Sequence, residues 1–326
     1  MSGSTLNELL QLRKLSDNEF ETVYFPIRMG NASAIAYGGC SLGVAAAAAC
    51  QTVPSTYRVY SLLGNFLGPA LTDRNFQCSV KRVRDTRTFA TRHVEVSQVQ
   101  DDGKKRPCLF MTLDFQTREP AVLMSFSAVP SGPFKHWSEE KTPAEWRAKF
   151  LEEGKLDRKG VAVHEMAMSV HEKLFEQRNC ESGYSAQVLN GIAKHLPTDQ
   201  DSLPLTERSS RQWVKSATHL SITEQIGGLA LFMDGALSFV PLLHDHKWLD
   251  DAGACSSLDF AMRVFESGVD FNQWHLHEMK TVVGAEGRTF SEAKLWDERG
   301  KMVANMSQQS IMRPKPDRGG KGKASL

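Results

Sequence analysis

The sequence predicts an α+β fold made of two related halves, each an antiparallel sheet wrapped around one central helix. Three observations support this prediction. The chain has 326 residues, enough for two domains that each bury a core. Each half contains one helical pattern followed by several strand patterns. Short stretches of the first half also recur in the same order in the second, as expected of a diverged tandem duplication.

The first half begins with a helix of unusually small side chains. Gly38 and Gly39 precede residues 41–51, where Ala45 to Ala49 give a high helix propensity and almost no side-chain bulk. Such a helix can lie very close to a sheet, and one smooth helix wrapped by antiparallel strands is the hot-dog arrangement. Strand patterns follow at residues 57–66, 76–84, 89–100 and 108–116.

The second half repeats this order. Residues 221–237 have helical periodicity, and strand patterns follow at residues 256–264, 273–283, 289–296 and 303–312. Three matches link the halves: Arg87-Thr88-Phe89 with Arg288-Thr289-Phe290, Gly103-Lys104 with Gly300-Lys301, and a strand that ends at Gln116 with one that holds Gln308. The sequence therefore predicts a double hot-dog fold with two sheets.

Between the halves lies a charged stretch, residues 130–178, with helix-compatible spacing but no strand signal. We expect an N-terminal hot-dog domain at 1–130, a connector with the leading strand of the second domain at 131–205, and a C-terminal hot-dog domain at 206–313. The irregular parts of the connector are expected to be mobile. Residues 314–326 are rich in Gly, Pro and basic side chains and are expected to be a disordered tail.

The composition excludes several classes of protein. The 39 Lys and Arg residues nearly balance the 38 Asp and Glu residues, so no global field recruits nucleic acid or an anionic membrane. The longest small or apolar run, Leu42 to Cys50, is too short to span a bilayer, and no secretory signal is evident. We expect a cytoplasmic protein. The terminal Ala324-Ser325-Leu326 is a poor peroxisomal signal because Ser325 replaces the basic residue.

Two features could carry other chemistry. Cys40 and Cys108 lie in apolar segments, where each is either a buried thiol or a nucleophile, and no nearby His is placed to activate them. His244-Asp245-His246 is either a solvated loop or a metal site. We expect the structural alternative in both cases, with no metal and no cofactor.

Several motifs, in a specific order, match a known family. They are Tyr37-Gly38-Gly39, Thr52-Val53-Pro54, Phe66-Leu67-x-Pro69, Met233-Asp234, Ser257-Leu258-Asp259, Asn272-x-Trp274 and Gln308-x-x-Ile311-Met312-Arg313. On these motifs the chain resembles the acyl-CoA thioesterase II family of fused double hot-dog enzymes. The resemblance implies a catalytic set of Asp234, Ser257 and Gln308, in which Ser257 replaces the usual Thr. The chain departs from the family pattern at Cys40, where the family usually has Gln, and at Phe260, where it usually has His. We expect these departures to affect substrate choice more than chemistry.

These residues suit thioester hydrolysis by activated water. Asp234 lies near the C-terminal end of its expected helix, where the helix dipole disfavours negative charge and raises the proton affinity of a carboxylate, so it is a candidate base. Ser257 and Gln308 can orient a water or the thioester oxygen. Gly38 and Gly39 are candidate binding residues whose backbone N–H groups could stabilise an oxyanion, or they could serve close packing alone. Arg87 is a candidate for the CoA phosphates, in a basic cluster with Lys81, Arg82 and Arg84, although strand alternation would split that cluster across two faces.

The resemblance implies hydrolysis of fatty acyl-CoA, or of a related acyl thioester, to free acid and CoA by a homo-oligomer. Two alternatives stay open. One is a non-catalytic acyl-CoA or acyl-carrier binding protein, and the other is a product-releasing thioesterase of a secondary-metabolite pathway. A hot-dog dehydratase is disfavoured because the His and Asp of its short helix motif are absent from the sequence.

Overall fold

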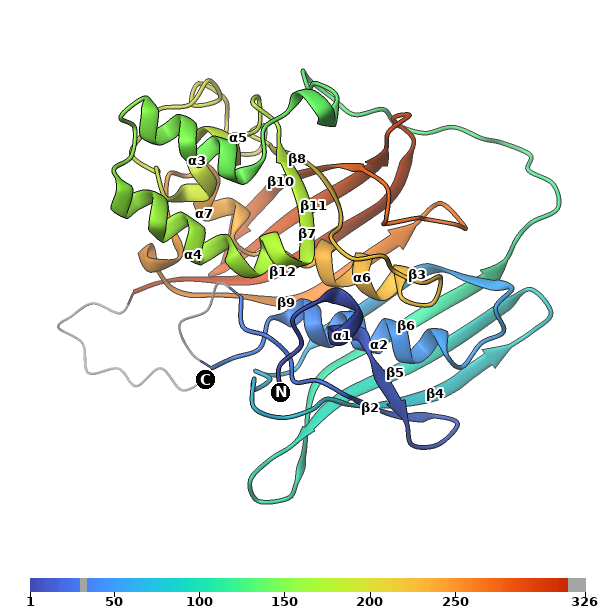
Figure 1. Cartoon of the computed structure of the whole chain (residues 1–326). Coiled ribbons are helices and arrows are strands. Elements are labelled where there is room, and N and C mark those ends of the chain that lie inside the picture. Colours follow the sequence, from blue (N-terminus) through green and yellow to red (C-terminus); the bar gives the residue numbers. More distant parts are fainter. Residues whose placement is uncertain (30–33, 316–326) are drawn as a thin grey trace.

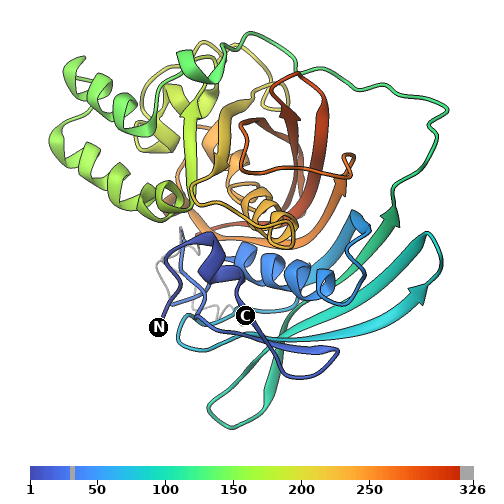
Figure 2. The ribbon, with the colours of Figure 1, turned by 45° about the vertical axis from the view of Figure 1, so that its right-hand side comes forward.

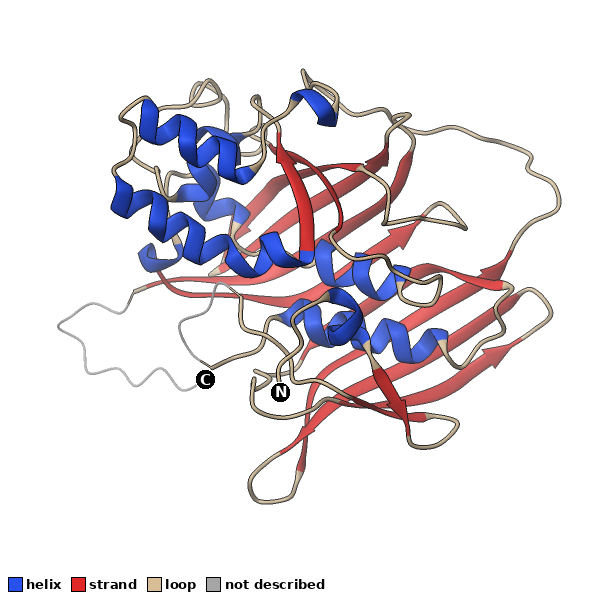
Figure 3. Ribbon diagram, viewed as in Figure 1, coloured by secondary structure: helices blue, strands red, loops and turns tan. Residues whose placement is uncertain are grey.

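The computed structural model describes residues 1–29 and 34–315. These residues form an α+β fold around one antiparallel sheet of twelve strands, in the order β1-β2-β4-β5-β6-β3-β9-β12-β11-β10-β8-β7 (Figure 3). Two separate sheets were expected. The sheet is continuous because β3 and β9, the neighbouring edge strands of the two halves, pair with each other.

The first half of the sheet surrounds helix α2. Its elements are α1 (Leu6–Leu10), β1 (Leu12–Lys14), β2 (Glu19–Thr22), α2 (Gly38–Cys50), β3 (Tyr57–Phe66), β4 (Gln77–Asp85), β5 (Phe89–Val99) and β6 (Lys105–Thr117). The four long strands lie close to their predicted positions, and α2 begins three residues earlier than predicted. The side chains of α2 are buried from Gly39 to Ala49, as its small side chains allow when the helix is enclosed by a sheet.

The second half has the same order. Its elements are β7 (Phe175–Asn179), β8 (Ser210–Ser216), α6 (Gln225–Met233), α7 (Val240–His244), β9 (Ala252–Val264), β10 (His275–Ala285), β11 (Arg288–Asp297) and β12 (Met302–Pro314). The predicted helix over 221–237 is wrong at both ends. Residues 221–224 form a turn, and the chain leaves the helix after Met233 to reach a positive φ of 67° at Ala236.

The middle of the chain is more ordered than predicted. It contains the short helix η1 (Trp137–Glu139), the helices α3 (Pro143–Glu152), α4 (Arg158–Leu174) and α5 (Tyr184–Gln187), and the short helix η2 (Leu189–Gly191). A small core of its own includes Trp146, Phe150 and Leu189. β7 also lies in this stretch, where no strand signal was recognised, because its sequence FEQRN carries a single large apolar residue. In the predicted tail, residues 316–326 lie outside the described residues.

The repeated stretches of sequence occupy matching places. β5 begins at Phe89 and β11 at Arg288, and the hairpin turns at Gly103 and Gly300 have nearly equal φ values of 77° and 78°. The third match needs a correction. Phe89 pairs with Gln116 while Phe290 pairs with Gln309, so the counterpart of Gln116 is Gln309.

The same register identifies the first-half counterpart of Gln308. One residue along each ladder, Ala90 pairs with Phe115 and Ser291 pairs with Gln308. The counterpart of Gln308 is therefore Phe115, an apolar residue.

Helices α2 and α6 pack against each other antiparallel at the centre of the molecule (Figures 1 and 2). Glycines allow this close approach. A Cβ added at Gly43 would lie 2.9 Å from the carbonyl oxygen of Gly227, and a Cβ added at Gly227 would lie 2.9 Å from that of Gly43. A Cβ at Gly39 would likewise lie 2.5 Å from the carbonyl oxygen of Leu231. The distance between the two helices is therefore set by backbone contact.

We expect Gly43→Ala to lower the stability of the protein by about 1 to 3 kcal/mol, because the added methyl group meets backbone that cannot move aside. Gly160→Ala is the control, since Gly160 is also helical but the one tight contact of its added Cβ, at 3.1 Å, would be with Cδ2 at the end of the flexible Leu156 side chain. Helix propensity alone favours alanine at both sites by about 1 kcal/mol. Equal or higher unfolding midpoints for both variants in urea would contradict the proposed helix contact.

Candidate active site

Asp234 lies at the C-terminal cap of α6, where the chain turns away from the helix. Its side chain is only 4% exposed, although a carboxylate normally stays in water unless it is paired. No basic side chain lies among the described contacts of its carboxylate. The charge is met by hydrogen bonds alone.

The first of these hydrogen bonds comes from Gln308 on β12. The side-chain amide of Gln308 is fully buried, and its Nε2 donates to Oδ1 of Asp234 at 2.6 Å. Its other end, Oε1, is buried without a hydrogen-bond partner among the described residues. One amide thus orients the carboxylate and keeps an acceptor free beside it.

The second hydrogen bond comes from the N-terminus of α2. The backbone N–H of Gly39 donates to the Asp234 carboxylate, and the positive end of the α2 dipole also favours negative charge there. A Cβ at Gly38 would lie 3.0 Å from Oδ2 of Asp234. Gly38 and Gly39 therefore belong to the surroundings of Asp234, and the Gly39 N–H is already used there, whereas it was expected to face an oxyanion.

Burial changes the acidity of this carboxyl. Desolvation raises the pKa of Asp234 from 3.8 to about 6, although the hydrogen bonds from Gln308 and Gly39 lower it. The sequence argument attributed a raised proton affinity to the dipole of α6, but the main cause is removal from water. Near neutral pH the group is ionised and basic enough to accept a proton.

Ser257 lies on β9 and faces the same side of the sheet as Gln308. Ser257 pairs with Ser310, which is two residues from Gln308 on β12, and a bulge at Leu258 shifts the register between them. Ser257 is partly exposed. No hydrogen bond joins its hydroxyl to Asp234 or Gln308 in the described part of the chain. The structure thus brings Asp234 and Gln308 into contact and places Ser257 one row away.

Tyr37 also holds this site in place. The sequence analysis did not identify it as a site residue. Its hydroxyl donates to the backbone carbonyl of Leu231 at 2.6 Å, which ties the residue before α2 to the last turn of α6. Tyr37 was noted only as part of a motif, and no spacing rule points to its partner 194 residues away.

Other candidate residues lie elsewhere. Arg87 is exposed in the turn between β4 and β5 and has no described contact with the site. Of its basic neighbours, Arg84 pairs with Asp114 at 3.4 Å and Arg82 donates to Asn18 at 3.1 Å. Local acceptors therefore meet two members of the proposed phosphate-binding cluster.

The cysteine and metal alternatives find no support in the described residues. Burial raises the pKa of Cys40 to about 12 and also raises that of Cys108, so neither is a thiolate near neutral pH. His244 contacts Ser210 at 3.0 Å, whereas His246 contacts Asp201 at 2.8 Å. Across residues 1–29 and 34–315 no group of three His, Cys, Asp or Glu side chains could hold a metal.

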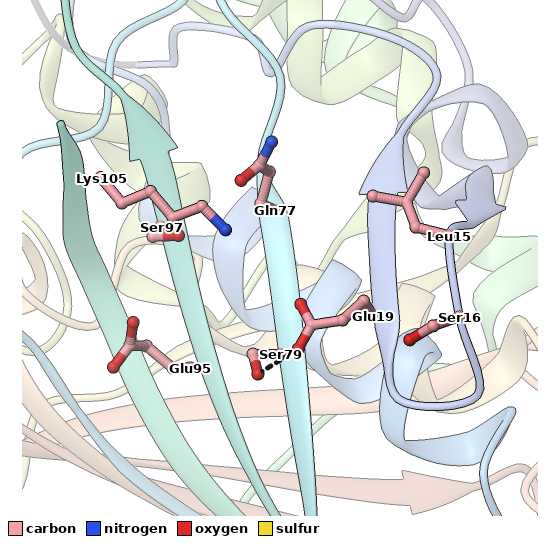
Figure 4. Close-up of a pocket in the computed structure, with 8 residues that line it drawn as sticks. All are labelled: Leu15, Ser16, Glu19, Gln77, Ser79, Glu95, Ser97 and Lys105. Carbon is pink, nitrogen blue, oxygen red and sulfur yellow. Dashed lines mark hydrogen bonds between the residues drawn. The ribbon is translucent and has the colours of Figure 1, made fainter. Parts of the chain in front are cut away.

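A surface hollow lies on the first half of the sheet, and Figure 4 shows that its lining is mixed. The lining residues are Leu15, Ser16, Glu19, Gln77, Ser79, Glu95, Ser97 and Lys105. On β4 and β5 these residues alternate with the buried Cys78 and Val96, which face α2. The hollow is therefore on the far face of the sheet from Asp234 and is not part of this site.

Comparison with known proteins identifies relatives over most of the chain. The family profile "Acyl-CoA thioesterase N-terminal domain" matches residues 25–116, and "Acyl-CoA thioesterase C-terminal domain" matches residues 171–312. Acyl-CoA thioesterase 2 of Haemophilus influenzae is 25% identical over 316 residues, which cover 95% of this chain and 97% of that protein.

Solved structures share the fold. An acyl-CoA thioesterase II from Mycobacterium marinum superposes with a TM-score of 0.65 at 20% identity, covering 97% of this chain and all of that one. A hot-dog protein of unknown function from Alicyclobacillus acidocaldarius superposes with a TM-score of 0.64 at 15% identity, covering 96% and 98% of the two chains. Within the described residues, no helix is both long and apolar enough to cross a bilayer.

The raised pKa of Asp234 has a consequence for stability. The folded state binds the Asp234 proton more tightly than the unfolded state does. The contribution of this group to the free energy of unfolding therefore falls as pH rises from about 4 to about 6 and is constant above that. Asp234→Asn removes this pH dependence of stability, because the amide does not titrate. We expect the variant to gain about 3 kcal/mol relative to wild type between pH ~4 and pH ~7. Urea denaturation at both pH values measures this, and an equal difference at each would contradict the buried charge.

Proposed function

We propose that this chain, which belongs to the acyl-CoA thioesterase family, hydrolyses acyl-CoA thioesters to free acid and CoA with a water molecule that Asp234 activates. The single observation that carries the mechanism is the buried Asp234–Gln308 pair. A carboxylate with a pKa of about 6 is ionised near neutral pH and is a stronger base than an exposed aspartate. As a family member the protein is a thioester hydrolase.

The reaction can be written through this pair. A water molecule donates one hydrogen bond to the Asp234 carboxylate and the other to the free Oε1 of Gln308. It is thereby held with one proton facing the base. As its oxygen attacks the thioester carbonyl carbon, that proton moves to Asp234 and negative charge develops on the carbonyl oxygen. Collapse of the intermediate breaks the carbon–sulfur bond, and the proton passes from Asp234 to the leaving CoA thiolate. Asp234 is then ready for another turnover.

Ser257 supplies a donor in this proposal. Its partly exposed hydroxyl lies on the face that holds Gln308, where it can donate to the carbonyl oxygen as that atom becomes charged. The thioester is expected to approach beside the half-buried Phe66, whose ring is tilted against Phe260 with centroids 5.5 Å apart. These aromatic side chains limit the access of bulk water to the carboxylate.

The finer organisation of the fold is also a proposal. We infer two hot-dog units, at residues 1–130 and 206–313, fused through the β3–β9 pair, with 131–205 as the connector. The antiparallel contact of α2 with α6 supports this division, because each helix is the central helix of its half. Assembly into a homo-oligomer stays a prediction.

We expect Asp234→Asn to lower kcat by about 100-fold or more because the base is lost, and Gln308→Ala by about 10- to 1000-fold because the carboxylate and water lose their orientation. CoA release from a panel of acyl-CoA esters, followed with a thiol reagent, measures both. Gln309→Ala is the matched control, since Gln309 faces the other side of β12 and contacts Asp259. Full activity in the Asp234→Asn variant would refute the general-base role of Asp234.

Ser257→Ala tests the donor separately. Loss of one hydrogen bond formed in the transition state should lower kcat by about tenfold with little change in KM. The neighbouring Ser256→Ala is the control, because Ser256 is exposed and points to the opposite face. Equal kcat values for the two variants would remove Ser257 from the mechanism.

A further inference from the structure

Beside the Asp234–Gln308 pair, the inner face of the second half carries a row of polar side chains. Ser291 on β11 lies directly opposite Gln308 on β12 and also opposite Thr281 on β10. Neighbouring strands are about 4.8 Å apart, so these three side chains are direct neighbours across the sheet. The row continues the site away from Asp234.

A second polar row runs beside the first. Thr289 pairs with Ser310, and Ser310 pairs with Ser257. Thr289 and Ser291 are two residues apart on β11 and so face the same side. Of these three paired residues only Ser257 is partly exposed, while Thr289 and Ser310 are 8% and 1% exposed. The two rows form one buried polar surface, with Ser257 at its accessible edge.

Three of these side chains keep hydrogen-bonding capacity that the described residues do not use. Ser291 Oγ, Thr289 Oγ1 and Gln308 Oε1 are buried and have no partner there. Each such group costs about 1 to 3 kcal/mol of stability, so three at neighbouring positions are unusual for a strand face that only supports packing. A ligand with its own polar atoms would satisfy them.

Helix α7, which packs on the two strands of this region, does not supply the missing partners. α7 packs over β10 and β11, and its sequence is VPLLH. The one polar side chain of α7, His244, contacts Ser210 on β8. Apart from His244, α7 therefore offers no polar side chain to the two rows.

The first half provides an internal comparison. The counterparts of Ser291 and Gln308 are Ala90 and Phe115, both 1% exposed and both fully apolar. The fold therefore accommodates apolar side chains at these positions. Ser291 and Gln308 are therefore not required by the sheet, and they occur in the half that holds Asp234, whereas the counterpart of Thr289 is the polar Thr88.

We propose that the two rows select an acyl group with a hydroxyl or carbonyl oxygen near its thioester end, which hydrogen-bonds to Ser291 and Thr289. This inference rests on the proposed thioester hydrolysis at Asp234 and names its substrate class. A plain alkyl chain lying on this surface would leave both hydroxyls desolvated and unpaired. An oxygenated chain pairs with them, and sites built around such hydrogen bonds discriminate strongly against analogues that lack the polar group.

The test compares 3-hydroxyhexanoyl-CoA with hexanoyl-CoA, two esters of equal chain length. Wild type is expected to have a kcat/KM at least about tenfold higher for the hydroxylated ester. Ser291→Ala and the isosteric Thr289→Val should each lower this ratio, and the double variant should remove most of it. Ser97→Ala, an equally buried strand serine of the first half, is the control and should keep the wild-type ratio.

The outcomes separate the two proposals. Hydrolysis of both esters without preference, or a preference that survives in the double variant, overturns the polar-acyl inference and leaves thioester hydrolysis intact. A preference that survives in the double variant would mean that Ser291 and Thr289 bind only water and not the acyl group. Absence of hydrolysis of either ester and of longer straight-chain esters overturns the proposed function, and the inference with it. Unfolding midpoints of each variant identify any loss of ratio that comes from misfolding.

Discussion

The geometry of the candidate active site depends on the close antiparallel contact between α2 and α6. Backbone approaches backbone at Gly43 and Gly227, and this places the N-terminus of α2 opposite the C-terminal cap of α6. Asp234 at that cap can then be buried without a cation, because Gly39 and Gln308 supply hydrogen bonds. A larger separation of the helices would leave the carboxylate either exposed, with an ordinary pKa, or buried without compensation.

The two halves share a framework but not a site. α2 ends at Gln51 where α6 ends at Asp234, and Phe115 occupies the place of Gln308. The first half thus lacks both the carboxylate and the amide, and contributes the N-terminus of its helix instead. Each half supplies what the other lacks, so one site arises from two copies of the same arrangement.

Much of this fold could be predicted from the sequence, because the signals were local. The strand over 57–66 has the bounds predicted for it, and the alanine run marks the central helix. The ends of α6 were wrong because tertiary contacts, rather than periodicity, determine where the chain turns at Ala236. Joining of the two sheets through β3 and β9 could not be predicted, since edge pairing leaves no pattern within either strand.

The candidate site was predictable only in part. The family resemblance supplied Asp234 and Gln308, and the structure places them in hydrogen-bond contact at 2.6 Å. Register was the missing information for the rest. The face shared by Ser291, Thr289 and Gln308 follows from the pairing register of β11 with β12, which is not encoded in residue spacing.

The central claim is that Asp234, a buried carboxylate with a raised pKa, is the general base of the reaction. The pH dependence of kcat/KM in wild type and in Gln308→Leu tests this claim most directly. The account predicts that kcat/KM rises with pH through an inflection near 6, and that the inflection moves higher in the variant, because the hydrogen bond that lowers the pKa of Asp234 is lost. A profile without an inflection in this range, or one at the same pH in both proteins, would contradict it.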